Sequence, residues 1–324
     1  MGEEKFSSLK GNDLLELLTE VDNSKLEYRS SLNLDKDTTF GVEIEYERWP
    51  RILTKRFVNN YLLLWESTFD ESLSFGGEVC SPILTDDIKY WESLKIICNY
   101  LKQRKVVTTN NAGGHIHVGA HILKGDYNYW RKFIKLYATY EHVLFRFLYG
   151  DKITARKSLI KYARPISNKV FMNIKLINEA KDMNEIRSAI PAKDRYQSIN
   201  FNNINFLKSS LKAYRNTVEF RSPNSSVDEV IIQNNINALT KLINSVKDSD
   251  FDEEFIDYKI EHSDISSQKR YVMYNEICLK DSLELVDLIF DNNEDKIYFL
   301  KQYLKEFEEI ENVYVAVKSK KLTK

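Results

Sequence analysis

The chain has 324 residues, 43% of them hydrophobic and 12% aromatic, so it is long enough to bury a sizeable core. Its formal net charge of −1 argues against a general attraction to nucleic acid or to a membrane surface. The three cysteines, Cys80, Cys98 and Cys278, have no paired spacing. Together with an acidic N-terminus and no run of 18 apolar residues, they lead us to expect a soluble cytoplasmic protein without a disulfide framework.

Hydrophobic spacing predicts the elements of the chain in order. In the first part we expect a short helix and a polar connection in 1–35, strands at 38–47 and 73–80, a helix at 84–104 and a strand at 114–121. In the second part we expect helices at 126–148 and 169–190, a strand pair at 195–207 and 214–221, a helix at 227–247 and mostly helical structure over 251–316. The simplest division is a helical leader (1–35), a core domain (36–247) and a helical C-terminal extension (248–324) packed on the same domain.

Alternation in the first strand places three carboxylates together. Residues two apart in a strand point to one face, so Glu43, Glu45 and Glu47 share a face and the apolar residues between them share the other. Clustered carboxylates repel one another, and a bound divalent cation removes that repulsion. The same pattern is also typical of an exposed, solvated sheet face.

Two histidines alternate in the same way in the strand at 114–121. His115 and His117 follow Gly113 and Gly114, and glycine is typical of places where a backbone bends or a ligand approaches closely. Two imidazoles at this spacing can bind a metal or contact phosphate. A zinc hydrolase and a purely structural pair are alternatives, but there is no HExxH motif, and the excess of carboxylates favours a harder metal.

Further polar residues alternate on the remaining strands. Glu219 and Arg221 form one pair, in which the arginine is a candidate phosphate clamp, although a weak surface ion pair is the alternative. Glu78 lies on the strand at 73–80, and Asn200 alternates with apolar neighbours after Arg195. Polar residues on one face of each of five predicted strands indicate a functional site rather than a chance pattern.

These motifs together resemble the amidoligase family, which belongs to the superfamily of glutamine synthetase and glutamate–cysteine ligase. The resemblance spans about 38–225 and rests on five segments in order, namely Phe-Gly-Val-Glu-Ile-Glu, Gly-Glu-Val-Cys-Ser-Pro, Gly-Gly-His-Ile-His-Val-Gly, Arg-Tyr-Gln-Ser-Ile-Asn and Thr-Val-Glu-Phe-Arg. It implies an α+β fold, with a curved antiparallel sheet forming an open half-barrel and helices on the outer face. It also implies an ATP-dependent carboxylate–amine ligase that works through an acyl phosphate with two Mg²⁺ or Mn²⁺ ions.

The resemblance also implies roles for particular residues. The implied metal ligands are Glu43, Glu45, Glu78, His115 and Glu219. Arg221 is the implied phosphate contact, so the expected catalytic residues are Arg221, Glu43 and Glu219. The implied or candidate nucleotide and substrate contacts are Arg195, Asn200, His117, Arg164 and Arg156.

One segment departs from the family pattern. After Glu-Phe-Arg the family often continues with an aromatic or apolar residue and Gly-Thr, whereas here 222–226 read Ser-Pro-Asn-Ser-Ser. The sequence therefore does not identify the acceptor substrate. The expected substrates are small-molecule, amino-acid, peptide or protein carboxylates and amines. A guanidino phosphotransferase, a non-catalytic binding module and a metal-dependent hydrolase are the alternative functions.

Overall fold

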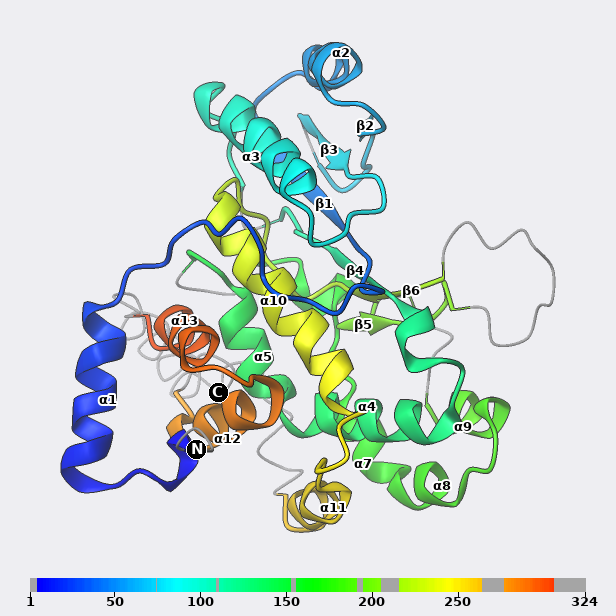
Figure 1. Ribbon diagram of the computed structural model, residues 1–324. Coiled ribbons are helices and arrows are strands. Elements are labelled where there is room, and N and C mark those ends of the chain that lie inside the picture. The colour runs from blue at the N-terminus through cyan, green and yellow to red at the C-terminus, as the bar shows by residue number, and fades with distance from the viewer. Residues whose placement is uncertain are drawn as a thin grey trace, which may run out of the picture.

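The computed structural model describes residues 5–73, 75–108, 111–152, 156–190, 195–204, 216–263 and 277–305. It is an α+β structure in which helices surround one sheet (Figure 1). The predicted parts of the strand pair at 205–207 and 214–215, and of the C-terminal extension at 264–276 and 306–316, lie outside the described residues.

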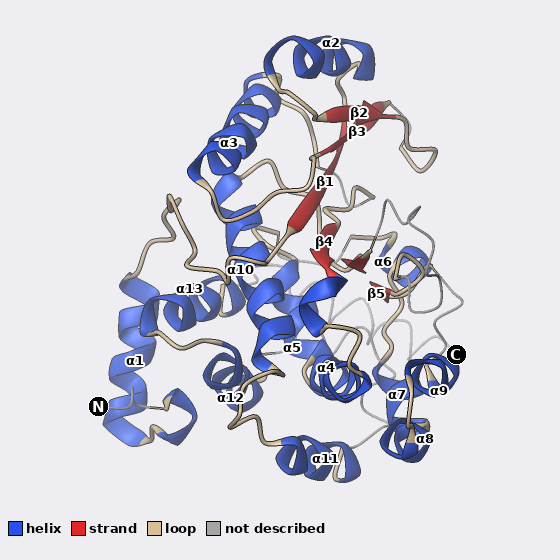
Figure 2. Cartoon of the chain, turned by 45° about the vertical axis from the view of Figure 1, so that its right-hand side comes forward, coloured by secondary structure: helices blue, strands red, loops and turns tan. Residues whose placement is uncertain are grey.

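The sheet is antiparallel throughout and open, because its two outer strands, β2 and β5, do not pair with each other. The strand order is β2-β3-β1-β4-β6-β5. Within it, β1 links the lobe formed by α2 (Arg51–Tyr61), β2 and β3 to the rest of the sheet (Figure 2). The bounds are β1 Phe40–Glu47, β2 Glu66–Thr68, β3 Gly76–Cys80, β4 Ile116–Gly119, β5 Ile199–Asn200 and β6 Thr217–Phe220.

The register places the polar residues of the strands on one face. Directly opposed residues of neighbouring strands share a face. The opposed pairs are Glu45 with Glu78, Glu43 with Cys80, Gly41 with His117, His117 with Glu219, and Glu219 with Asn200. The alternation predicted from the sequence therefore extends across the sheet as a continuous polar surface.

The other face of the sheet is apolar and covered by helices. Trp91 of α3 (Ile88–Gln103) stacks on Phe40 with ring centroids 5.1 Å apart. Phe133 and Tyr137 of α4 (Tyr127–Thr139) pack against Phe220 with ring centroids 6.4 and 5.9 Å away. The long helix α10 contacts β4 and α3 (Figure 1). These contacts bury the apolar residues of the strands in the main core.

The helices largely follow the predicted segments. Their bounds are α1 Gly11–Asn23, α2 Arg51–Tyr61, α3 Ile88–Gln103, α4 Tyr127–Thr139, α5 Glu141–Leu148, α6 Leu159–Tyr162, α7 Ser167–Met172, α8 Ile174–Glu179, α9 Met183–Ala189, α10 Glu229–Ser245, α11 Glu253–Glu261, α12 Leu279–Ile289 and α13 Asn293–Tyr303, with the 3₁₀ turns Phe6–Ser8 and Ala120–Leu123.

Two predicted helices are broken in the structure. The segment 126–148 splits into α4 and α5 at Tyr140, whose φ of −109° and ψ of 16° leave helical geometry. The segment 169–190 forms three short helices, and the last begins where the Asp182 carboxylate accepts hydrogen bonds from the backbone N–H groups of Asn184 and Glu185. Helix α2 and strand β2, which belong to the same lobe as β3, were not predicted.

The C-terminal helices pack on the same core. Helix α12 contacts α10 and α13, and α13 contacts α5 and α1. Asp287 of α12 accepts a hydrogen bond of 3.0 Å from the backbone N–H of Phe6, which joins the two ends of the described chain. Among the described residues, no helix is both long and apolar enough to cross a membrane.

Candidate active site

A cavity of about 670 Å³ opens on the polar face of the sheet. It collects side chains from five strands and from the loops beside them. Those lining it are Glu43, Glu45, Phe69, Asp70, Glu71, Ser72, Glu78, Asn111, His115, His117, Arg156, Ser158, Tyr162, Arg195, Tyr196, Asn200, Asn202, Asn203, Glu219 and Arg221. Six carboxylates and three guanidinium groups in this set make the cavity strongly charged.

Glu43 occupies the centre of the carboxylate group. Its Oε2 is 2.9 Å from Nδ1 of His115, and its Oε1 is 3.0 Å from Nε2 of His117. Nδ1 of His117 in turn lies 3.2 Å from the hydroxyl of Thr217, which fixes the plane of that ring. Burial raises the pKa of Glu43, but the hydrogen bonds from the two imidazoles outweigh burial and hold the pKa well below its usual value.

Glu78 lies in a different electrostatic environment from Glu43, across the β1–β3 pair. Burial, and then repulsion by the Glu43 carboxylate, raise the pKa of Glu78 to about 7. Its Oε2 accepts a hydrogen bond of 2.9 Å from Thr68 and one of 3.4 Å from the thiol of Cys80. The site thus has more carboxylates than its own cations neutralise, which is the condition that favours a bound metal ion.

Three groups of potential ligand atoms lie close together here. The atoms of Glu43, His115 and Glu219 lie within 4.8 Å of one another, as do those of Glu45, Glu78 and His115. A third such group joins Glu43, Glu78 and Cys80. These groups share Glu43, Glu78 and His115, and most of their donor atoms are carboxylate oxygens, the kind of ligand that Mg²⁺ and Mn²⁺ accept.

Gly113 is where the backbone comes closest to the ligand group. Its N–H donates a hydrogen bond of 2.6 Å to Oε2 of Glu45. A Cβ at this position would lie 2.1 Å from Nη1 of Arg156 and 2.8 Å from Nε2 of His115. Both distances are far below van der Waals contact, so the absence of a side chain lets Glu45, His115 and Arg156 converge.

Glu219 and Arg221 form a pair that is largely removed from solvent. Nη1 of Arg221 donates to Oε1 of Glu219, and only 16% and 7% of these two side chains is exposed. Asn200 donates a hydrogen bond of 2.6 Å to the other oxygen of Glu219, and Nε of Arg221 donates to the carbonyl of Tyr162 at 3.2 Å. The alternative of a solvated surface ion pair is therefore wrong for these residues.

The segment 222–226, where the sequence departs from the family pattern, lies behind the site. Ser225 donates a hydrogen bond of 2.6 Å to the carbonyl of Glu45, and the carbonyl of Pro223 accepts from the backbone of Gly114 at 3.0 Å. The side-chain oxygen of Asn224 accepts from the backbone N–H of Arg156. The segment is mostly buried and does not line the cavity, so it supports the site from behind rather than forming a substrate loop.

The structure brings all but one of the predicted site residues to the cavity. Arg195 lies at its exposed rim with Nη2 2.8 Å from the hydroxyl of Tyr196, and Arg156 is buried with Nη1 donating to the carbonyl of Pro223 at 2.9 Å. Burial lowers the pKa of Arg156 to about 10, so it keeps its charge at neutral pH. Arg164 does not line the cavity, and its Nη1 donates to the carbonyl of Lys161 at 3.3 Å.

Sequence reasoning missed an acidic loop and a thiol at the site. Asp70 and Glu71, between β2 and β3, line the cavity but sit on no recognisable motif, and β2 itself was not expected. Cys80 has the same strand parity as Glu78, and that signal was available in the sequence. Tyr162, whose carbonyl accepts a hydrogen bond from Arg221, also belongs to no motif in the sequence.

The structure is thus an α+β protein with an open antiparallel sheet. The polar face of that sheet brings carboxylates, imidazoles and guanidinium groups together in one charged cavity. The family model described as "Putative amidoligase enzyme" matches residues 20–243. The chain belongs to this family, whose name marks it as an enzyme of the ligase type. No curated protein matches the chain.

Proposed function

We propose that the protein is an ATP-dependent carboxylate–amine ligase that uses two divalent metal ions. The observation that carries the proposal is the division of charge across one sheet face. Glu43, Glu45 and Glu78 lie on β1 and β3. Arg221 and Arg195 lie beside β6 and β5, toward the opposite edge of the sheet. A metal–phosphate substrate needs both kinds of group side by side.

The metal ligands in this proposal are Glu43, Glu45, Glu78, Glu219 and His115. Carboxylate oxygens with a single imidazole suit Mg²⁺ or Mn²⁺ better than a thiophilic metal. The raised pKa of Glu78 is caused first by burial and then by repulsion from the Glu43 carboxylate, and it supports the assignment because a bound cation would relieve that repulsion. The ions would neutralise the charge of the phosphates during transfer.

Arg221 is suited to contact the phosphoryl group. Glu219 and the carbonyl of Tyr162 hold its guanidinium from two directions, so its orientation is set before substrate arrives. Pre-arranged cations of this kind stabilise charge as it develops in the transition state. Arg195 at the rim is placed to contact the same anionic substrate, and the backbone around Arg221 is fixed by Arg156, whose Nη2 lies 2.5 Å from the Arg221 carbonyl.

The proposed reaction has two steps. An oxygen of the substrate carboxylate attacks the γ-phosphorus of ATP, the bond to ADP breaks, and an acyl phosphate forms. The nitrogen of the amine then attacks the acyl carbon, phosphate leaves, and the amine gives up a proton. We assign the amine to the side of the cavity lined by Asp70 and Glu71, because carboxylates attract an ammonium group and can accept its proton.

A panel assay tests this function and separates it from the alternatives. Purified protein is incubated with ATP, Mg²⁺ and pairs of amino acids or peptides, and phosphate, ADP and products are quantified by mass spectrometry. A ligase releases phosphate and forms a condensed product lighter than its two substrates by one water. A phosphorylated product without free phosphate would indicate a phosphotransferase, and cleavage without ATP a hydrolase, and either outcome would overturn the proposal.

A further inference from the structure

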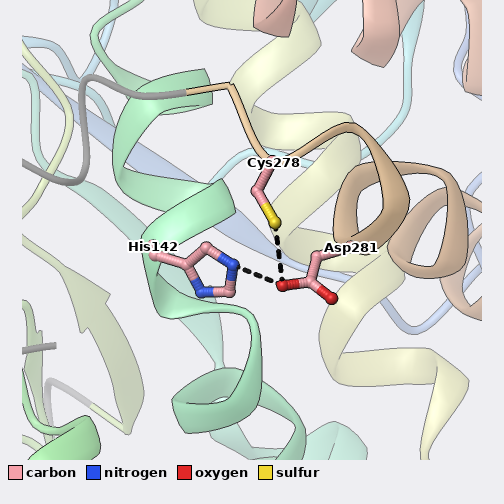
Figure 3. A group of neighbouring side chains, drawn as sticks. All are labelled: His142, Cys278 and Asp281. Atoms are coloured by element: carbon pink, nitrogen blue, oxygen red, sulfur yellow. Dashed lines mark hydrogen bonds and ion pairs between the residues drawn. The ribbon is translucent and has the colours of Figure 1, made fainter. Parts of the chain in front are cut away.

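A second group of potential metal ligands lies where α5 meets α12 (Figure 3). His142 is in the first turn of α5, Cys278 directly precedes α12, and Asp281 is in the first turn of α12. Nε2 of His142 lies 2.7 Å from Oδ2 of Asp281, and the thiol of Cys278 lies 3.1 Å from the same oxygen. One ligand atom from each residue lies within 4.8 Å of the others, and none of the three lines the cavity described above.

The surrounding residues hold these side chains in a converging arrangement. Lys259 Nζ lies 2.7 Å from Oδ1 of Asp281, which leaves Oδ2 directed at His142 and Cys278. The backbone N–H of Cys278 donates a hydrogen bond of 2.8 Å to the hydroxyl of Tyr303, which fixes the start of α12. Outer hydrogen bonds that orient the ligating groups are a regular feature of metal sites in proteins.

Burial and charge also suit a divalent ion. The side chains of His142 and Asp281 are 23% and 22% exposed, so the group is largely shielded but accessible to a water molecule. With Cys278 as a thiolate, the three anions Cys278, Asp281 and Glu284 outnumber the two lysines that contact them. Lys259 contacts both carboxylates, and the exposed Lys280 lies 3.8 Å from Oε1 of Glu284. The remaining negative charge favours a bound cation.

A nucleophilic role for Cys278 is less consistent with this geometry. Burial, together with the Asp281 carboxylate, raises the pKa of Cys278 to about 11, whereas reactive thiols lie in electropositive surroundings. The thiol donates to the Asp281 carboxylate rather than to the imidazole, so His142 is not placed to activate it as a nucleophile. A metal ion, in contrast, deprotonates a coordinating thiol outright.

We propose that His142, Cys278 and Asp281 bind a thiophilic divalent ion, Zn²⁺, with water as the fourth ligand. One nitrogen, one sulfur and one carboxylate oxygen are donors that zinc accepts, and three protein ligands leave a position for water. The thiol proton passes to solvent as the zinc–sulfur bond forms. The Nε2 proton of His142, which faces Oδ2 of Asp281, is also lost to solvent as the neutral imidazole takes up its remaining proton at Nδ1, and the ring then binds the ion through the Nε2 lone pair. Tetrahedral geometry separates ligand atoms by about 3.3–3.7 Å, so Nε2 of His142 and the sulfur of Cys278 each move roughly half an ångström away from Oδ2 of Asp281 on binding.

The zinc would connect the family-matched part of the chain to the region that follows it. His142 lies within residues 20–243, whereas Cys278 and Asp281 lie beyond them. This site therefore differs from the proposed catalytic metals in ligand chemistry and in its place in the fold. It does not depend on the proposed ligase activity.

Cobalt absorption tests the site directly, because a cobalt–thiolate bond gives a charge-transfer band in the near ultraviolet. Cys80 lies near the proposed catalytic metals, so the titration uses Cys80→Ser protein and compares it with the double variant Cys80→Ser, Cys278→Ser. We expect one equivalent of Co²⁺ to give the band in the first protein, Zn²⁺ to displace it, and the second protein to lack it. No band in the first protein, or an equal band in the second, would overturn the proposal.

Alkylation of the unmodified protein gives a second test that requires no variant to fold. Iodoacetamide labelling of each cysteine is followed by mass spectrometry with and without Zn²⁺, after Mg²⁺ has been added to occupy the oxygen-rich site. We expect Zn²⁺ to slow the labelling of Cys278 by on the order of tenfold or more. Labelling of Cys278 at the same rate with saturating Zn²⁺ would refute zinc binding, whatever the enzyme's activity.

Discussion

Replacing Arg221 with lysine should separate charge from geometry at the proposed phosphoryl-transfer site. The arginine uses Nη1 for Glu219 and Nε for the carbonyl of Tyr162 at 3.2 Å, in a pair with only 16% and 7% side-chain exposure. A lysine keeps the positive charge but has a single donor head, so it cannot reach both partners and a phosphate oxygen with the geometry of a planar fork.

Loss of Arg221 contacts has two energetic costs, which are similar in size but are reported by different measurements. Losing one hydrogen bond from a charged group costs about 1.5–3 kcal/mol of unfolding free energy, which lowers Tm by several degrees. Losing a pre-arranged contact to the transition state costs on the order of 100-fold in rate, equivalent to about 2.7 kcal/mol of activation free energy. We therefore expect nucleotide affinity to be nearly unchanged while the single-turnover rate falls about 100-fold.

Single-turnover kinetics, nucleotide binding and thermal melting of the same Arg221→Lys protein provide the three readouts. Arg164→Lys is the matched control, because Arg164 lies nearby but does not line the cavity, and we expect its rate to stay within a few-fold of wild type. An unchanged rate in Arg221→Lys, with unchanged affinity, would refute the assignment of Arg221 to phosphoryl transfer.

Three further predictions concern the carboxylate side of the cavity. Glu43→Ala should abolish ATP turnover and metal binding together, whereas Glu47→Ala should leave turnover intact, because Glu47 does not line the cavity; equal losses would refute this division. Gly113→Ala should cost about 1–3 kcal/mol of stability and weaken Mn²⁺ binding, and a well-folded variant with normal affinity would contradict the close packing. The pKa of Glu78 is raised to about 7, so the protonated side chain contributes fully to the free energy of unfolding below a pH of about 4.5, and this contribution is lost as the pH rises through 7. With chelator present, wild-type Tm should therefore fall relative to Glu78→Gln between pH 5 and 8, and parallel profiles would refute the raised pKa.

The polar face of the sheet could be predicted from sequence because strand alternation is a local property. Once β1, β3, β4 and β6 were expected, the side on which Glu43, His117 and Glu219 point followed from the period of two residues. The family motifs then supplied the order in which these strands contribute to one site.

Features that depend on tertiary contacts were not predictable in the same way. The break at Tyr140 has no proline or glycine to announce it, and at this break the buried Glu141 carboxylate accepts hydrogen bonds from the backbone N–H groups of Ile166 and Ser167. The group formed by His142 and Asp281 joins residues 139 positions apart, so no motif spacing could reveal it. Strand β2 is only three residues long, too short for its alternation to indicate a strand.

The transfer of oxygen from the carboxylate substrate to phosphate tests the central claim most directly. The carboxylate identified by the substrate panel is labelled with ¹⁸O, and the phosphate released with ATP, metal ion and amine is analysed by mass spectrometry. An acyl-phosphate ligase transfers one labelled oxygen to each phosphate, because that oxygen bridges carbon and phosphorus in the intermediate. Unlabelled phosphate alongside the amide product would contradict the proposed mechanism.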